Sequence, residues 1–306
     1  LFDFEGDMLE AVRASDTVMI TVSGKSGVKV GTEKAYAAAQ KMNKASMFVI
    51  TKVDDPDANF YNVLTDLKTV FGPTVCPVIV PVIKDRQVVS YINLIEMKCY
   101  KYDDKGNVSE TDMPTAEISE KIDYRLDGLV AAFSEAVAET DDALMEKFFE
   151  DPDSITADEL LAAIRKATIS MQIVPMLCGS SFHNKGVQKL LDYVMAFLPS
   201  PLDLPPVTGM NPKTEQEEVR HASESDPFCG LAFKIATDPF VGRLAFVRVY
   251  SGKLDAGSYV LDTRSGKRER ISRIYQMHAN KQNPMETVGA GDICAAVGFK
   301  EIRTGD

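Results

Sequence analysis

Thr51, Lys52 and Asp54 stand directly after the apolar run 47–50, which has the length and composition of a buried strand. A carboxylate at the end of such a strand can accept two hydrogen bonds from one edge of guanine, one from the ring N–H and one from the exocyclic amine. Adenine has no such pair of donors, so a site built around Asp54 would reject it. The stem of Lys52 can pack along the base. The tetrapeptide 51–54 therefore predicts a guanine-recognition loop, although an ordinary polar turn would look the same.

A second loop could complete this site. Cys178, Gly179, Ser180 and Ser181 follow the apolar run 173–177. Small residues let the backbone approach a ligand closely, and the N–H groups of Ser180 and Ser181 could donate to the carbonyl oxygen of guanine. Alone, this stretch is better interpreted as an ordinary strand-to-helix turn. Both loops would lie at the carboxyl ends of parallel strands, where ligands of such sheets bind.

A phosphate-binding loop is not found in these 306 residues. Gly24, Lys25 and Ser26 resemble the end of the pattern G-x-x-x-x-G-K-[ST], but Met19 stands where its first glycine should be. We expect a surface loop here, leading into a helix that Thr32 caps. Without a phosphate cradle, a guanine site should hold a nucleotide weakly, because the phosphates provide much of the charge-assisted binding.

The elements expected to position these loops alternate between strand and helix over residues 1–200. Strands are predicted at 16–22, 47–50, 76–81 and 169–177, and helices at 32–43, 59–71 and 186–198. Strands separated by helices of this length predict a parallel α/β sheet of the kind found in P-loop GTPases, here without the phosphate loop. An α+β insertion at about 84–168 interrupts it, with strands at 88–91 and 96–102 and helices at 118–139, 142–150 and 156–167.

The pattern changes after residue 200. A proline-rich and polar linker is expected at 201–226, and 227–306 has the short strands and glycine turns of a small all-β barrel. Its strands are predicted at 228–236, 243–251, 258–262, 268–278 and 293–298. The chain is therefore expected to hold a partial GTPase domain at 1–200, a linker, and a barrel domain whose C-terminal end is missing.

Composition limits the class of protein. The net charge of −11 argues against indiscriminate binding of nucleic acid, although it allows a local RNA contact. The five cysteines and three histidines are widely spaced, so we expect neither a disulfide framework nor a metal site, and the cysteine usage suits a reducing cytoplasm. No segment has the length of a membrane span.

Several stretches together resemble the GTPase domain of elongation factor G: 3–4, 24–32, 51–54, 136–142, 177–182 and 184–192. Residues 232–244, 249–252 and 277–280 resemble the second domain of that family, and the resemblance covers nearly all of the chain. It implies that the intact protein binds GTP and GDP with Mg²⁺, hydrolyses GTP, and moves tRNA and mRNA on the ribosome. It also implies that the second domain contacts ribosomal RNA, for which exposed cations are available at Lys253, Arg264, Lys267, Arg268 and Arg270. Solubility explains the same charges equally well.

The resemblance also indicates what these residues lack. The family's phosphate loop and magnesium-binding switch are not in the sequence, and Asp3 and Phe4 match the pair just after the catalytic histidine, where Leu1 stands. We therefore expect a piece of a longer GTPase that is catalytically inactive by itself, with no catalytic residue and no metal ligand; a natural paralogue that lost these parts is the alternative. The family usually has asparagine at the position of Thr51, whose hydroxyl can make only part of the amide's contacts.

Two other functions remain open at this point. A ribosomal-protection protein, which removes an antibiotic from the ribosome, has the same architecture over this region. A nucleotide-independent module that binds the ribosome or a protein could retain the guanine loop as a structural relic. The basic and aromatic cluster Phe182, His183, Asn184 and Lys185 is interpreted as the start of a capped helix.

Overall fold

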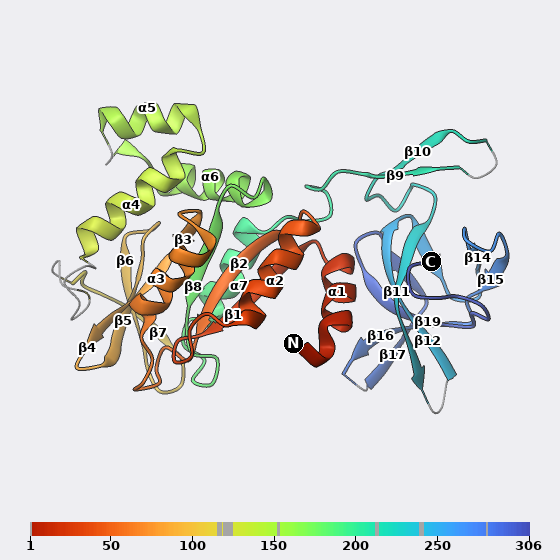
Figure 1. Ribbon diagram of the computed structural model, residues 1–306, viewed down its shortest axis with the longest axis horizontal. Helices are drawn as coiled ribbons and strands as arrows, with labels where there is room; N and C mark the ends of the chain where they lie inside the picture. The colour runs from red at the N-terminus through yellow and green to blue at the C-terminus, as the bar shows by residue number, and fades with distance from the viewer. Residues whose placement is uncertain are drawn as a thin grey trace. The chain divides into compact units, whose positions relative to one another are not determined.

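A computed structural model describes residues 2–114, 118, 125–151, 154–211, 214–238, 242–279 and 281–306 (Figure 1). The chain divides into two compact units. One is Thr17–Pro199, here called the α/β unit; the other combines Leu1–Asp16 with Ser200–Asp306 and is called the β unit. The sequence had suggested that the first sixteen residues accompany the parallel sheet, whereas the structure groups them with the second unit.

The α/β unit is organised around a four-stranded parallel sheet in the order β1-β2-β8-β3. Its strands are β1 (Thr17–Ser23), β2 (Ala45–Thr51), β8 (Val174–Cys178) and β3 (Val75–Pro77). β2 and β8 are buried along almost their whole length, which is why both appear in the sequence as continuous apolar runs. The predicted parallel sheet is confirmed.

Helices cover both faces of this sheet. Figure 1 shows α2 (Val30–Lys41) and α3 (Phe60–Phe71) in front of the strands and α7 (Val187–Phe197) behind them. α3 begins as predicted, since the side chain of Asn59 accepts a hydrogen bond from the Asn62 N–H at 3.0 Å.

The start of α2 differs from the prediction. The helix begins at Val30, and Thr32 is its third residue rather than its cap. The Thr32 hydroxyl still serves the helix end, because it accepts a hydrogen bond from the Lys29 N–H at 3.3 Å. A threonine near a helix start has the same appearance in the sequence at either position.

The insertion has its own antiparallel sheet, in the order β4-β5-β6-β7. Its strands are β4 (Ile79–Lys84), β5 (Gln87–Asn93), β6 (Lys98–Tyr102) and β7 (Val108–Thr111). The apolar run 76–81 was expected to form one strand, but it is divided. Its first part is β3 of the parallel sheet, and its second part is β4 of the insertion.

Three helices complete the insertion: α4 (Leu126–Ala138), α5 (Asp142–Glu150) and α6 (Ala157–Ile169). Most of residues 118–124, where the longest predicted helix was expected to start, lie outside the described residues. One continuous core connects the parallel sheet with the insertion, and its largest buried side chains include Phe48, Tyr61 and Phe133. No helix in the described part of the chain is long and apolar enough to cross a membrane.

The β unit is built on a five-stranded antiparallel sheet in the order β11-β12-β19-β16-β17. The strands are β11 (Cys229–Asp238), β12 (Gly242–Ser251), β19 (Ile293–Val297), β16 (Arg273–His278) and β17 (Lys281–Met285). The predicted strand 268–278 is interrupted at the buried Ile271, so that its first part joins a different ribbon.

Three two-stranded ribbons surround this sheet. They pair β9 (Val207–Met210) with β10 (Glu217–Arg220), β13 (Lys253–Asp255) with β18 (Thr287–Gly289), and β14 (Tyr259–Leu261) with β15 (Arg268–Arg270). The first ribbon lies inside the predicted linker, so 201–226 is not featureless.

A short N-terminal segment also belongs to the β unit. It contains a 3₁₀ turn, η1 (Phe2–Phe4), and the helix α1 (Glu5–Ala14). The Arg248 guanidinium on β12 lies 2.8 Å from the Asp16 carboxylate and donates to the Ala14 carbonyl oxygen at 3.3 Å. A cation at this position satisfies the C-terminal end of the helix, where unpaired carbonyl oxygens gather.

Candidate nucleotide-binding site

The register of the parallel sheet brings the predicted loops together. Ile50 on β2 is paired with Cys178 on β8, and Ser23 on β1 is paired with Thr51. The Gly179 N–H donates to the Ile50 carbonyl at 3.0 Å, and the Gly24 N–H donates to the Thr51 carbonyl at 2.8 Å. The loops that follow these three strands therefore meet at one edge of the sheet, at the carboxyl ends of its strands.

The loop 51–54 turns sharply after β2. Lys52 has a positive φ of 57°, and its carbonyl accepts a hydrogen bond from the Asp55 N–H at 3.2 Å. Val53 is buried and anchors the loop, while Lys52 is exposed and the Asp54 side chain is 25% exposed. The Thr51 hydroxyl lies 3.5 Å from the Val22 carbonyl oxygen, which connects the loop to β1. Asp54 is thus held on a short, anchored turn with its carboxylate partly open to solvent.

The segment Gly24–Ser26 is a turn beside this loop. The Lys25 ammonium lies 2.6 Å from the Asp57 carboxylate and 3.6 Å from that of Asp55. The hydrogen bond from Lys25 lowers the pKa of Asp57 below its ordinary value. Lys25 therefore neutralises the acidic residues that follow Asp54, which differs from the role of the lysine in a phosphate-binding loop.

The second loop is closed by backbone contacts. The Ser180 N–H donates to the Lys185 carbonyl at 2.9 Å, and the Lys185 N–H returns a bond of 2.9 Å to the Ser180 carbonyl. The expectation that Ser180 offers its N–H to a base does not fit this geometry, because that donor is already used. Ser180 is buried, whereas Ser181 is exposed and is the residue whose N–H could face a ligand.

Two glycines make this closure possible. A Cβ atom at Gly179 would lie 2.6 Å from the Lys185 carbonyl oxygen. Gly186 has a φ of +83°, and it is the residue before α7, with no side-chain cap. The predicted capped helix start is therefore not what the cluster 182–185 forms; these residues make a tight turn before the helix.

This turn brings His183 next to the loop 51–54. Its Nε2 lies 3.3 Å from the Asp54 carboxylate, with 47% of the His183 side chain exposed. The ring of Phe182 is 91% exposed and meets the His183 ring edge-on, with centroids 5.1 Å apart. Sequence reasoning did not connect His183 with Asp54, because residues so far apart in the chain become neighbours only through the pairing of β2 with β8.

The insertion places one buried aromatic residue, Tyr91, near Asp54 and Cys178. Tyr91 on β5 is buried, and its hydroxyl has no hydrogen-bond partner among the described residues. Burial raises its pKa well above the ordinary range, and the neighbouring Cys178 and Asp54 act in the same direction. Tyr91 therefore remains a neutral phenol.

Metal ligation is not supported by the residues that the structure describes, since no three His, Cys, Asp or Glu side chains among them form a group that could hold an ion. A magnesium ion of the kind used by GTPases does not fit the donor set of the described residues.

A cavity of about 480 Å³ lies elsewhere, in the β unit. Apolar residues such as Phe228, Val247 and Phe299 line much of it. Large apolar hollows are the usual first candidates for ligand sites. Here the charged groups that line it are already paired, Arg220 with Glu218 and both Asp262 and Asp306 with Arg264, so they are poorly placed to orient a ligand.

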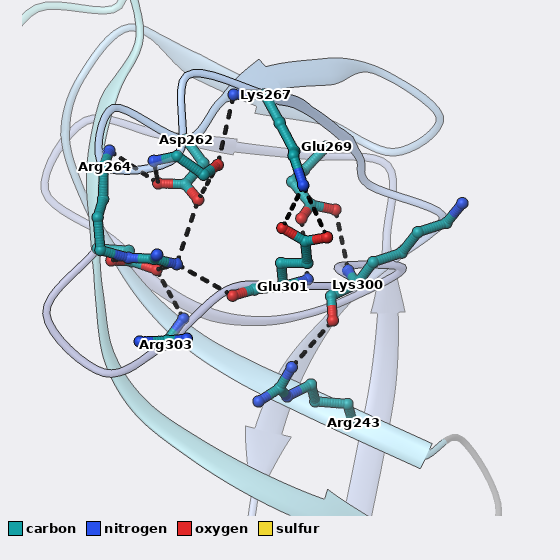
Figure 2. A network of polar contacts seen from close by, with 10 residues as sticks. Arg243, Asp262, Arg264, Lys267, Glu269, Lys300, Glu301 and Arg303 are labelled. Carbon is teal, nitrogen blue, oxygen red and sulfur yellow. Dashed lines mark hydrogen bonds and ion pairs between the residues drawn. The ribbon is translucent and has the colours of Figure 1, made fainter.

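The five lysine and arginine residues predicted to be available for RNA binding fall into two groups. Three are paired with carboxylates: Lys253 with Glu224, Arg264 with Asp306 and Lys267 with Glu301. Figure 2 shows that Arg264 and Lys267 belong to a network that joins the β14–β15 ribbon to the segment 300–306. The remaining two, Arg268 and Arg270, are exposed on β15 on either side of the buried Glu269.

Arg268 and Arg270 share one face of the ribbon with two exposed apolar side chains. Arg270 is paired with Tyr259, and Arg268 is paired with Leu261. Directly opposite residues of an antiparallel pair project to the same side, so these four side chains form one surface, here called the ribbon face. Tyr259 is 63% exposed and Leu261 is 50% exposed.

Comparisons with known proteins agree with this architecture. The family described as Elongation factor Tu GTP binding domain matches residues 2–200, and the family described as Elongation factor G domain 2 matches residues 227–306. Proteins named Elongation factor G from Cytophaga hutchinsonii and Amoebophilus asiaticus are 48% and 46% identical to the chain over 99% of its length. The chain spans 43% of each of these relatives.

A solved structure from Thermus thermophilus has the same fold over the whole chain. Its TM-score is 0.78 at 27% sequence identity, and the match covers 42% of that protein. The match to the GTP-binding family alone covers more than half of the present residues, and the match to the second domain follows it in the chain. The chain belongs to the elongation factor G family of translational GTPases.

Proposed function

We propose that this chain forms the guanine-reading part of an elongation factor G-type GTPase together with its second domain, and that the intact protein binds and hydrolyses GTP on the ribosome to move tRNA and mRNA. The observation that carries the proposal is the placement of Asp54 and the loop 179–181 at neighbouring strand ends of one parallel sheet. In this proposal Asp54 accepts the two guanine donors, Lys52 packs on the base and Thr51 braces the loop.

The two serines have different tasks in this proposal. Ser181 donates its N–H to the base carbonyl, while Ser180 acts indirectly, by closing the loop against Lys185. GTP and GDP are thus the proposed ligands, and Mg²⁺ is proposed for the intact protein with ligands outside these residues. We further propose that the 306-residue chain does not hydrolyse GTP by itself, since its sequence has no phosphate loop.

Replacing Asp54 by asparagine tests the guanine assignment. The variant loses one charged acceptor, so the preference for GDP over ADP should fall about 10- to 100-fold. Equilibrium titration of both nucleotides against the wild-type chain and the variant measures it, with Asp55→Asn as the matched control on the same loop. An unchanged preference in Asp54→Asn would refute the role of Asp54.

We propose ribosomal RNA as the partner of the β unit, through the ribbon face. Arg268 and Arg270 supply cations that no described carboxylate pairs with, and Tyr259 supplies an exposed aromatic ring. Phosphate contacts by arginine and stacking by aromatic rings are common in RNA binding. Arg264 and Lys267 are better explained as structural, because their charges are used within the network of Figure 2.

Two other functions predict different measurements. A ribosomal-protection protein would restore translation in the presence of an antibiotic without supporting translocation. A nucleotide-independent binding module would bind the ribosome equally well with and without GDP, and its Asp54→Asn variant would behave as wild type.

A further inference from the structure

We infer that His183 competes with guanine for Asp54, so that the imidazole occupies the base-reading carboxylate until a nucleotide displaces it. This inference rests on the proposed guanine site and adds to it a residue that lowers the affinity of that site for guanine nucleotides. The contact that carries it joins the His183 Nε2 and the Asp54 carboxylate over 3.3 Å.

The position of His183 is fixed by its loop. The paired hydrogen bonds between Ser180 and Lys185 close the base of the turn, and the Asn184 N–H donates to the Ser181 carbonyl at 3.3 Å. Asn184 has a positive φ of 51°, which a turn of this tightness requires. His183 is therefore presented to Asp54 by an ordered turn rather than by a free tail.

The insertion supports the same turn from another side. A Cβ atom at Gly106 would lie 2.9 Å from the Asn184 carbonyl oxygen, so the turn at 103–107 is packed closely against this loop. That turn is itself fixed, since the Asp103 carboxylate accepts hydrogen bonds from the Lys105 and Asn107 N–H groups at 2.8 Å each.

The chemistry of the two occupants is alike. A protonated imidazole offers Asp54 a positive charge, and a neutral one can offer a single N–H. Guanine offers two N–H donors from one edge, so it can satisfy the carboxylate more completely than His183 does. Adenine cannot, so it would leave the His183 contact as the better arrangement. Guanine nucleotides are therefore expected to displace His183 from Asp54, whereas adenine nucleotides leave the contact in place.

The size of the effect follows from the exposure of the pair. Asp54 is 25% exposed and His183 is 47% exposed, so the contact is worth no more than an exposed ion pair. Removing the imidazole should raise the affinity for GDP about two- to fivefold. The affinity for ADP should change little, because ADP leaves the His183 contact in place, so the ratio of GDP to ADP affinity should rise with the affinity for GDP.

The experiment uses the 306-residue chain with GDP and ADP as probes. The variants are His183→Ala, Asp54→Asn and the double variant, and equilibrium dialysis measures their affinities. The matched control is His221→Ala, since His221 makes an equivalent contact with Asp226 at 3.3 Å in the β unit. We expect tighter GDP binding in His183→Ala, no effect of the same change in the Asp54→Asn background, and no effect of His221→Ala.

A second measurement does not depend on affinity. Histidine-selective isotope labelling gives three imidazole signals, one for each histidine in the chain. GDP should shift the His183 signal toward its position in Asp54→Asn, while the His221 and His278 signals stay in place. ADP should move it far less.

The outcomes separate this inference from the guanine site on which it rests. If Asp54→Asn loses guanine preference but His183→Ala binds GDP as wild type does, the site stands and the competition is refuted. Weaker GDP binding in His183→Ala would make His183 a ligand contact, which also refutes it. If Asp54→Asn keeps full guanine preference, the site itself fails and the inference fails with it.

Discussion

The contact between Arg248 and the end of α1 gives a sharp test of what holds the N-terminal segment in the β unit. Arg248 is buried, and its guanidinium reaches both the Asp16 carboxylate and the Ala14 carbonyl oxygen. Methionine at this position would keep much of the side-chain volume but would donate no hydrogen bond. The Asp16 carboxylate, which is 16% exposed, would then remain largely buried without its cation.

The expected cost follows from this geometry. Breaking a buried ion pair by removing one partner costs about 3–5 kcal/mol. Two observations place the cost of Arg248→Met at the lower end of this range, at about 3 kcal/mol. Asp16 keeps some access to water, and the Nε of Arg248 has no hydrogen-bond partner in the described structure, so the native arrangement is itself incompletely satisfied. Such a loss corresponds to about a 100-fold change in an opening equilibrium.

Hydrogen exchange measures this opening directly. Peptides that cover α1 should exchange about 100-fold faster in Arg248→Met than in the wild-type chain. A global unfolding curve is less suitable, because a chain of two units need not unfold in one step. Arg243→Met is the matched control on the same strand, since its exposed guanidinium donates to the Lys300 carbonyl at 3.1 Å and does not reach α1.

Adding Asp16→Asn to Arg248→Met should recover part of the protection, because the unpaired charge is removed. Protection of α1 that stays within twofold of wild type in Arg248→Met would refute the reasoning. So would an equal loss of protection in Arg243→Met, since the effect would then not depend on the buried pair.

Three further predictions concern the loop, the network and the ribbon face. Gly179→Ala should destabilise the α/β unit by about 1–3 kcal/mol, because its added methyl would lie 2.6 Å from a backbone carbonyl oxygen; thermal unfolding measures this. The hydrogen bond from Arg264 holds the pKa of Asp306 in the folded chain below its ordinary value. The ionised Asp306 carboxylate therefore stabilises the β unit above about pH 4, and this stabilisation is lost as the pH falls through the lowered pKa of Asp306. In Arg264→Met, the free energy of unfolding of the β unit in urea should therefore depend less on pH between about 3 and about 7 than in the wild-type chain. Replacing Arg268 and Arg270 together by alanine should lower the salt dependence of binding to small ribosomal subunits by about two units of slope.

Controls for these predictions are available in the same chain. Gly209→Ala adds a methyl group that would have no atom within 4 Å, so it should leave stability nearly unchanged. Lys267→Ala removes a cation that already lies 2.7 Å from Glu301, so it should alter the salt dependence less than either ribbon arginine. A larger effect from Lys267 would contradict the assignment of the ribbon face.

The elements that were predictable from sequence are those with strong local signals. β2 is a continuous apolar run, and α3 has an asparagine cap followed by an apolar face, with Leu64 and Leu67 buried. The Thr51–Asp54 loop could be placed because it follows such a strand. In each case one local pattern specifies both the element and its end.

Elements that depend on tertiary partners were missed. The ribbon of β9 and β10 is largely exposed, so its strands have no apolar alternation to reveal them. The division between β3 and β4 was missed because both strands are buried, and an apolar run does not specify which sheet each half joins. The commitment of the Ser180 N–H to Lys185 depends on Gly179 and Gly186, whose effect on the backbone is not visible as a pattern.

The division of that apolar run has a mechanical consequence. A single residue, Val78, lies between β3 of the parallel sheet and β4 of the insertion, and it is fully buried. Its N–H donates to the Met176 carbonyl on β8 at 2.9 Å, and its carbonyl accepts from the Leu94 N–H at 3.0 Å. The residue between the two strands is therefore buried, and both its backbone N–H and its carbonyl are hydrogen-bonded, so a protease has no exposed backbone to cut at Val78. A displacement of the insertion at Val78 therefore acts directly on β8, the strand that ends at Cys178, immediately before the loop 179–181.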